Sequence, residues 1–245
     1  MQETVIQHWL WALAINVLLI IFCQRLPLLT SAGWVHAGIV GTILWGSLGW
    51  RGWLAIVLYL IFGSIVTRLG LREKTHAGIA EARGGRRAAP NVWGSAATGV
   101  ILAMMIAVGV QPAALLRLGF AASFAAKLAD TCGSEIGKRW GRTTVLVTTF
   151  QPVPAGTEGA ISLEGTLASI SGSILMSLVM LVLVPFGGLS SCLIVIISGL
   201  IATFLESLIG ATLQERVSWL NNEIVNSAQT TTAALLAMTL DLLFC

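Results

Sequence analysis

Charged side chains are scarce in this sequence. Only 10% of its 245 residues are Asp, Glu, Lys or Arg, and 56% are hydrophobic, whereas soluble globular domains carry roughly 25% charged residues. With a mean hydropathy of +0.87, this composition excludes an ordinary soluble protein and predicts a membrane protein that crosses the bilayer several times. The formal net charge of +3 is too small and too dispersed for a nucleic-acid-binding surface.

Residues for the common zinc and nucleophile motifs are also few. The three histidines and four cysteines form no CxxC or mixed cluster, which argues against a zinc site or a disulfide framework. We expect the cysteines to be packing residues, namely Cys23, Cys132, Cys192 and Cys245. Without a Ser-His-Asp or Cys-His set, acyl transfer and histidine-based phosphatase chemistry are not expected. The N-terminus lacks the basic region and cleavage site of a signal peptide, so the first apolar run is expected to be retained.

Long apolar runs are abundant. Runs able to cross about 30 Å of hydrocarbon predict about eight spans, at residues 9–24, 33–49, 53–69, 92–110, 112–128, 166–184, 189–206 and 227–244. The expected fold class is therefore an all-α, polytopic bundle of transmembrane helices that forms a single domain over residues 1–245. The fifth run carries Arg117 and is rich in Ala, Gly and Ser, which suits a helix packed among other helices.

The basic residues fall mainly on one side of these spans. With the N-terminus outside, only Arg51 and Arg117 lie on the outer side, and the other 12 of the 14 Lys and Arg residues are cytoplasmic. Nine of the 11 acidic residues, Glu215 among them, fall on the same side, which an orientation signal alone would not require. Several tryptophans, including Trp50, would lie at the outer interface. We expect a multi-pass protein of a plasma or thylakoid-type membrane whose long loops are cytoplasmic.

The stretch 124–166 is the longest interval in which charged residues, hydroxyls and glycines outnumber bulky apolar residues. Read as a helix, it places five polar side chains on one face, with Glu135 beside them: Lys127, Asp130, Thr131, Ser134 and Lys138. Carboxylates such as Asp130 and Glu135 are ligands suited to Mg²⁺, and the lysines could contact phosphates. The alternative is a salt-bridge ladder at a helix end, but this helix continues an apolar span, where charged groups are usually functional.

Two loops could also bind phosphate. Arg86, Arg87 and Asn91 close a Gly-rich basic loop, which could grip phosphate; the alternative is an orientation signal that also attracts anionic membrane lipids. The turn Gly156-Thr157-Glu158-Gly159 and Ser162 precede the sixth span, where an anion nest could form at a helix N-terminus, although such turns often only cap helices.

A fourth polar segment follows the seventh span. Glu206 lies near the cytoplasmic end of that span, with Gly210 and Gln214 on the same stripe, so its carboxylate should face a cavity or a metal. Asn222, Asn226 and Thr230 stack at the start of the eighth span, where helix–helix hydrogen bonding is an equally good reading of the asparagines. Elsewhere, we expect Asn16 and His36 to be satisfied within the membrane and Arg117 and Asp241 to be snorkelling end residues.

Carboxylates, a divalent metal and basic residues are the components of phosphoryl transfer, a reaction that depends mostly on positioning and charge neutralisation. We expect the four polar segments to converge at the cytoplasmic ends of the helices. If the acceptor is a lipid monophosphate, its dianion is already a nucleophile and no strong general base is required.

Four of these motifs resemble those of a known protein family. Residues 129–137 (ADTCGSEIG), 153–159 (VPAGTEG), 206–214 (ESLIGATLQ) and 222–226 resemble, in order, the signatures of the integral-membrane phytyl-phosphate kinase family. The similarity covers nearly the whole chain. It departs at position 206, where the family more often has Asp, and at Cys132. The resemblance implies transfer of a phosphoryl group from a nucleoside triphosphate, CTP by preference, to a prenyl monophosphate lipid, giving the prenyl diphosphate for tocopherol and phylloquinone synthesis.

Residue by residue, the resemblance implies a catalytic set of Lys127, Asp130, Glu135 and Glu158. It implies Mg²⁺ ligands at Asp130, Glu135 and Glu206. Phosphates would contact Lys127, Arg86, Arg87, Lys138 and Arg142, and the nucleotide would be cradled by Gly156, Thr157, Gly159 and Ser162, with Asn91 and Asn226 completing the site.

Two other functions remain open at this point. A CTP-dependent lipid-phosphate cytidylyltransferase uses the same reactants but yields a CDP-lipid and pyrophosphate. An ion-coupled transporter would favour charges near the midplane and broken helices, and it would show flux without nucleotide turnover.

Overall fold

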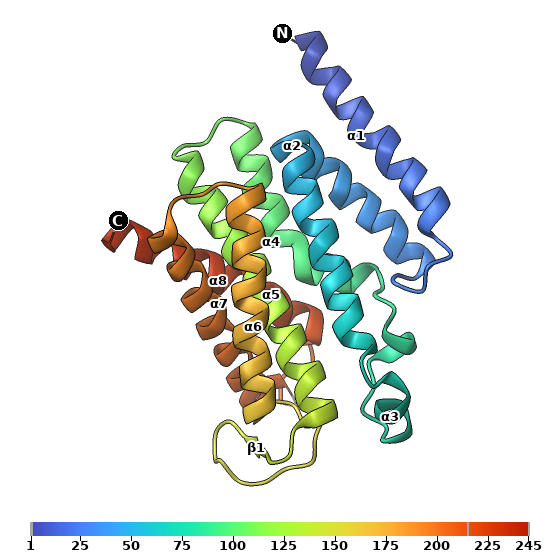
Figure 1. The fold of residues 1–245 in the computed structure, drawn as a ribbon, viewed down its shortest axis with the longest axis vertical. Coiled ribbons are helices and arrows are strands. Elements are labelled where there is room, and N and C mark those ends of the chain that lie inside the picture. Colours follow the sequence, from blue (N-terminus) through green and yellow to red (C-terminus); the bar gives the residue numbers. More distant parts are fainter. Residues whose placement is uncertain (1, 215, 245) are drawn as a thin grey trace.

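The computed structural model describes residues 2–214 and 216–244, and side chains from residue 6 onward. Glu215 and Cys245, which the sequence interpretation used, lie outside the described residues. Figure 1 shows a helical bundle. Its elements are α1 (Gln2–Cys23), α2 (Ser31–Arg68), α3 (Leu71–His76), the 3-10 turn η1 (Ala82–Gly85), α4 (Ala89–Ala107), α5 (Ala113–Trp140), β1 (Thr144–Leu146), β2 (Ala160–Ser162), α6 (Leu163–Leu183), α7 (Leu189–Ile209), the π-helical η2 (Gly210–Gln214) and α8 (Asn222–Phe244).

The apolar helices confirm a mostly helical membrane protein. Five of the described helices are long and apolar enough to cross a membrane: Ile6–Cys23, Ser31–Arg68, Ala89–Ala107, Leu163–Leu183 and Leu189–Gln214. Within the described residues, α5 and α8, which carry much of the polar sequence, are not among these five. The count of eight spans therefore stays a prediction.

Helix α2 contains two of the predicted spans in one helical segment. The segment changes direction at Gly49, whose φ of 74° is open to glycine because it has no Cβ. Asn16 of α1 joins the second half of α2 by accepting a hydrogen bond from Trp53 Nε1 at 3.1 Å. His36 in the first half accepts one from Trp93 Nε1 of α4 at 2.8 Å. Both side chains are satisfied between helices, as the sequence predicted.

Helix α5 lies at the centre of the bundle, where it packs against α4, α6, α7 and α8. Every residue from Leu118 to Ala129 is buried, and Phe124 packs against Phe120 and Tyr59 with ring centroids 5.2 and 5.4 Å apart. The predicted packing of this small-residue helix among others is confirmed. The helix does not stop at residue 128, however, but continues through the polar motif to Trp140.

Small residues bring α5 and α6 into close contact. A Cβ atom added to Gly172 of α6 would lie 2.9 Å from the carbonyl oxygen of Leu128 and from Sγ of Cys132, and one added to Gly165 would lie 2.8 Å from the carbonyl oxygen of Gly133. Cys132 and Cys192 are buried, in agreement with their predicted packing role. The close approach fixes the polar half of α5 against the start of α6.

A small β-hairpin departs from the all-helical expectation. β1 and β2 pair antiparallel, with Thr144 opposite Ser162, and they connect α5 to α6 below the bundle in Figure 1. Three-residue strands leave no periodic signal in the sequence, which is why this element was missed. The hairpin returns residues 155–162 to the end of α5.

Candidate active site

A cavity of about 440 Å³ lies at the end of the bundle that carries the hairpin, and six helices contribute to its lining. All four polar segments named from the sequence meet in it. Of the predicted site residues, the lining contains Arg86, Arg87, Asn91, Lys127, Asp130, Glu135, Lys138, Gly156, Thr157, Glu158, Gly159, Ser162, Glu206 and Asn226. The structure thus brings these side chains together, while their individual roles stay predictions.

Lys127 connects two of the polar segments. Its side chain is buried, and its ammonium group donates to the Asp130 carboxylate within α5 and to Oδ1 of Asn226 in α8, the latter at 2.6 Å. The Lys127–Asp130 pair is the intrahelical contact that the salt-bridge reading predicted. It lies in the cavity wall and not on a solvated helix face. A buried ammonium group held in this way is a fixed positive charge beside the carboxylate.

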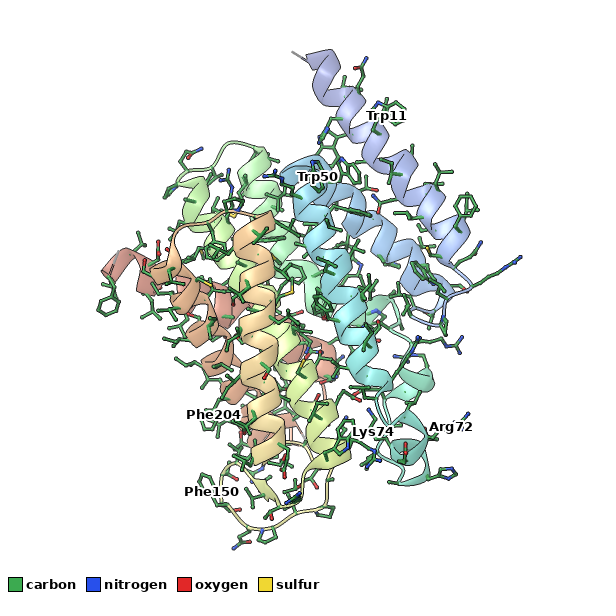
Figure 2. All side chains as sticks on the ribbon, viewed as in Figure 1. Trp11, Trp50, Arg72, Lys74, Phe150 and Phe204 are labelled. Carbon is green, nitrogen blue, oxygen red and sulfur yellow. The ribbon has the colours of Figure 1, made fainter. Side chains whose placement is uncertain are left out.

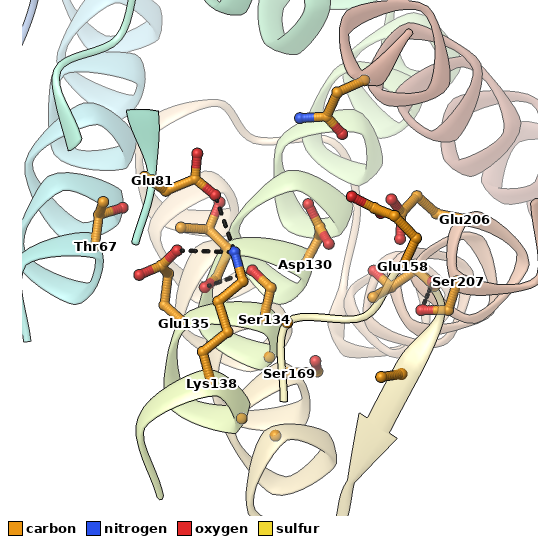
Figure 3. Close-up of a pocket in the computed structure, with 18 of the residues that line it drawn as sticks. Thr67, Glu81, Asp130, Ser134, Glu135, Lys138, Glu158, Ser169, Glu206 and Ser207 are labelled. Carbon is orange, nitrogen blue, oxygen red and sulfur yellow. Dashed lines mark hydrogen bonds and ion pairs between the residues drawn. The ribbon is translucent and has the colours of Figure 1, made fainter. Parts of the chain in front are cut away.

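Three carboxylates approach one another on the side of the cavity near α7. Figure 3 shows Asp130 facing Glu158 and Glu206, and Glu206 lies within electrostatic range of Asp130, Lys127 and Glu158. Gly210 lets the hairpin loop lie close to the end of α7, because a Cβ there would be 3.2 Å from the amide nitrogen of Gly159. Neighbouring carboxylates repel one another unless a cation lies close to them.

The carboxylates of the cavity fit a Mg²⁺ ion that would also be bound by the phosphates of a substrate. Among residues 2–214 and 216–244, no three His, Cys, Asp or Glu side chains form a group able to hold a metal alone. Mg²⁺ does not need such a group, because it is usually bound through one or two carboxylates, with waters and substrate phosphates in the other positions. Asp130 and Glu206, with Glu158 nearby, satisfy that requirement.

Glu135 lies apart from these carboxylates. Its Oε2 atom pairs with Lys74 of α3, and both side chains are at most 2% exposed. Lys74 also donates to the carbonyl oxygen of Thr67 at 2.9 Å. The Oε1 atom of Glu135 has no hydrogen-bond partner among the described residues. The predicted metal role of Glu135 therefore competes with a buried ion pair that joins α3 to α5.

Lys138 lines the cavity between two carboxylates. Its Nζ atom is 3.2 Å from Glu81 Oε1 and 3.7 Å from Glu135 Oε1. Burial favours the neutral amine, but the carboxylates of Glu81 and Glu135 outweigh it and raise the pKa of Lys138 above its ordinary value. Lys138 is thus a cation at neutral pH and can contact a phosphate.

The basic loop before α4 is held by side-chain contacts. Arg83 has a left-handed φ of 56° and donates to Asn91 Oδ1 at 3.0 Å, and Asn91 donates to Glu223 Oε1 of α8 at 2.9 Å. Arg87 donates to the Tyr59 hydroxyl at 2.7 Å and stacks over its ring. Arg86 contacts the carbonyl oxygen of Arg83 at 3.2 Å. Arg87 and Asn91 thus have structural partners besides their predicted phosphate role.

Two sequence predictions differ from the structure. Arg142 does not line the cavity, because it follows the end of α5, where its side chain is 92% exposed and 4.0 Å from Glu164. Gln214, which lies at the end of the π-helical turn after α7, does not line the cavity with Glu206.

Comparison with known proteins identifies the family. Residues 14–234 match the family described as "Integral membrane protein DUF92". The chain belongs to this family. Its motifs at 129–137, 153–159, 206–214 and 222–226 all fall within the matched residues. The family predicted from those motifs, the integral-membrane phytyl-phosphate kinases and their relatives, is confirmed.

Relatives of this DUF92 protein occur in bacteria, plants and archaea. An uncharacterized membrane protein of Synechocystis sp. is 47% identical over 235 residues, covering 94% of this chain and 90% of the relative. Protein VTE6, chloroplastic, of Arabidopsis thaliana is 40% identical over 225 residues, covering 88% of this chain and 67% of the relative. An uncharacterized membrane protein of Methanocaldococcus jannaschii is 31% identical over 244 residues, covering 100% and 97%. No solved structure matches the chain.

Sequence reasoning included Lys74 of this DUF92 protein only as one of the cations of the basic loop. The pair with Glu135 joins residues 61 positions apart, which no local pattern reveals. One signal was available, because the chain has only three lysines and the other two, Lys127 and Lys138, were already candidates. Arg83 was likewise seen only as part of the basic loop, although it lines the cavity.

Proposed function

We propose that this DUF92 protein is a membrane kinase that transfers the γ-phosphoryl group of a nucleoside triphosphate, CTP by the resemblance of its motifs, to a prenyl monophosphate such as phytyl phosphate. The product would be the prenyl diphosphate used in tocopherol and phylloquinone synthesis. The family supports a kinase-like membrane protein; the donor, the acceptor and Mg²⁺ belong to the proposal.

One observation carries the proposal. A single cavity combines buried or partly buried cations, Lys127 and Lys138, with a cluster of carboxylates around Asp130. Two phosphorylated reactants repel each other, so their reaction requires fixed positive charge on both and a metal between them. The cavity supplies the charge and the oxygen ligands in one place.

In the proposed reaction, a phosphate oxygen of the prenyl monophosphate attacks the γ-phosphorus. The bond from that phosphorus to the β,γ-bridging oxygen breaks, and the nucleoside diphosphate leaves with the electron pair. Lys127, held between Asp130 and Asn226, is positioned to neutralise the phosphoryl group in transfer. Mg²⁺ bound at Asp130 and Glu206 would neutralise charge on the donor phosphates.

The hairpin loop is the proposed nucleotide cradle. Gly156 and Gly159 adopt left-handed φ values of 89° and 72°, the backbone conformation from which anion nests are built. Ser162 caps α6 by accepting a hydrogen bond from the amide of Gly165 at 3.1 Å. The cap places the N-terminus of α6 at the cavity, where its dipole favours phosphate.

The prenyl chain would enter from the side of the bundle. On this side, the cavity lining includes the large apolar side chains of Ile170 in α6 and of Leu200 and Phe204 in α7. Phe204 is 50% exposed on the outer surface, and Figure 2 shows it on the flank of the bundle. The cavity therefore reaches the flank that would face lipid, so an isoprenoid tail can lie in the bilayer while its phosphate lies beside Lys127.

We further propose eight spans, with this cavity open to the cytoplasm. The bend of α2 at Gly49 supports two spans in that helix, and α5 and α8 traverse the bundle beside the apolar helices. With this topology, 12 of the 14 basic residues are cytoplasmic.

The test is a reconstitution with purified protein. The protein is incubated with Mg²⁺, a panel of prenyl monophosphates and each of four labelled nucleoside triphosphates. The proposal predicts a nucleoside diphosphate and a prenyl diphosphate as products. A CDP-lipid with pyrophosphate would instead identify a cytidylyltransferase, and ion flux in proteoliposomes without nucleotide turnover would identify a transporter.

A further inference from the structure

A second cavity of about 440 Å³ lies at the opposite end of the bundle. It is formed by the bend of α2 and by the ends of the helices that meet it: Ser47, Leu48, Gly49, Trp50, Arg51, Ile106, Arg117, Leu183, Val184 and Pro185. The proposed reaction uses none of these residues.

Two arginines give this cavity a positive charge. Arg51 and Arg117 are 66 positions apart in the sequence, yet both line it, and no lining residue is acidic. In the part of the chain that the structure describes, neither guanidinium group forms an ion pair with a carboxylate. The two arginines have weak contacts. Nη1 of Arg117 lies 3.5 Å from the carbonyl oxygen of Pro185, and the guanidinium carbon of Arg51 lies 5.5 Å from the centroid of the Trp50 ring. Both charges are therefore available to an anion.

These two arginines are also the ones that the topology leaves on the outer side. Positive residues are disfavoured there, so two that meet in one cavity are not explained by orientation. A guanidinium group binds phosphate oxygens bidentately, which makes phosphate the anion that suits this pair.

A buried hydroxyl adds a third polar group. The Oγ atom of Ser47 is buried and has no hydrogen-bond partner among the described residues. Buried polar atoms nearly always have a partner. An anion in the cavity would supply one once the Ser47 side chain turned toward it.

We propose that this cavity binds the phosphate of an anionic membrane lipid at the outer leaflet. The lining combines the arginines with apolar side chains such as Leu48, Ile106 and Leu183, which suits a headgroup with its acyl chains better than a free ion. Trp50 is 53% exposed at this end of the bundle, at the level where tryptophans meet lipid headgroups. The inference is independent of the proposed kinase activity.

The experiment measures lipid binding to the full-length protein in detergent by native mass spectrometry. The probes are phosphatidylglycerol and phosphatidylcholine with the same acyl chains. We expect phosphatidylglycerol to bind the wild-type protein about tenfold more tightly, and the double variant Arg51→Gln/Arg117→Gln to lose that preference. Arg72→Gln, which removes an exposed cation at the other end of the molecule, is the matched control and should keep it.

Three further measurements test the proposal more closely. Arg51→Lys/Arg117→Lys keeps the charge but not the bidentate geometry and should show a smaller loss, as should Ser47→Ala. An excess of inorganic phosphate should not displace the lipid. Equal binding of the two lipids, unchanged binding by the double glutamine variant, or displacement by inorganic phosphate would each overturn the inference.

Discussion

At the scale of single residues, the site depends on how charges are paired within the bundle. Lys127 is buried with two partners, and Lys74 is buried with one carboxylate and one carbonyl. Breaking a buried ion pair costs more than removing both of its members, because one charge is left without compensation. The two pairs differ in position. Lys127 and Asp130 both line the cavity, whereas Lys74 lies behind Glu135 and does not.

Asp130→Asn is expected to reduce turnover on the order of 10²-fold or more, because it removes a carboxylate from the proposed metal and phosphate site. Asparagine keeps the shape and an oxygen acceptor for Lys127, which also remains bonded to Asn226. The Lys127 and Asp130 side chains are 7% and 17% exposed, whereas those of Lys74 and Glu135 are 1% and 2% exposed, so the protein should remain folded. Nucleoside diphosphate release and thermal unfolding in detergent measure the two effects. Glu73→Gln is the matched control, since Glu73 is 60% exposed and forms only a surface pair with Arg139. Normal turnover in Asp130→Asn would remove Asp130 from the mechanism.

Glu135→Gln is expected to lower the free energy of unfolding by about 3–5 kcal/mol, because it leaves the Lys74 ammonium buried without a carboxylate. The double variant Lys74→Met/Glu135→Leu should recover most of that stability, because neither charge remains. Thermal unfolding in detergent compares the three proteins. If the double variant is as unstable as Glu135→Gln, the pair is not the source of the stability. Since Oε2 of Glu135 is taken by Lys74, we also expect the Mg²⁺ dependence of turnover to be unchanged in the double variant.

At the scale of secondary-structure elements, the contact between α5 and α6 positions the site. Its glycines allow backbone atoms of one helix to touch the other, and the polar half of α5 is thereby held against the N-terminus of α6. The sequence predicted both helices but not this contact, because a glycine in an apolar helix does not show which neighbour it faces. The same limit explains why the hairpin and the π-helical end of α7 were missed: both are fixed by contacts distant in sequence, such as that of Gly159 with Ala211.

Gly172→Ala is expected to destabilise the protein by about 1–3 kcal/mol, the usual cost of overpacking. The added methyl group would lie 2.9 Å from the carbonyl oxygen of Leu128, and backbone cannot move aside easily. This clash opposes the better helix propensity of alanine, about 1 kcal/mol. Gly188→Ala is the matched control, because a Cβ there meets nothing within 4 Å. Equal melting temperatures for the two variants would show that the α5–α6 contact is looser than described.

At the scale of the whole molecule, the convergence of the four polar segments was predictable, and the detailed pairing within them was not. Helical spacing places Lys127, Asp130 and Lys138 on one face of α5, and all three line the cavity. A membrane gathers charged segments at its surfaces, so segments far apart in sequence had to meet at one end of the bundle. The position of Arg142 was misjudged because it follows the polar motif closely in the sequence. The sequence does not reveal that the helix ends at Trp140 and that the Arg142 side chain then lies in solvent.

The orientation in the membrane gives a prediction for the whole molecule. In a variant without native cysteines, Arg142→Cys should react with a membrane-impermeant maleimide only after cells are permeabilised, because position 142 is 92% exposed on the proposed cytoplasmic side. Val108→Cys, at a position 78% exposed at the other end, should react in intact cells. The reverse pattern would invert the topology and place the site outside the cytoplasm.

Because α5 contributes to both the hydrophobic core and the cavity, its position has a consequence for how this family diversifies. Phe120 and Phe124 of this helix lie in the hydrophobic core, and Asp130 of the same helix lines the cavity. A mutation that moved the acidic groups would therefore also disturb the packing of the bundle. On the proposed function, new acceptor preferences should therefore arise at the rim, in the hairpin loop and around Phe204, while α5 changes little. Adaptation to a longer or shorter isoprenoid would then leave the reaction chemistry untouched.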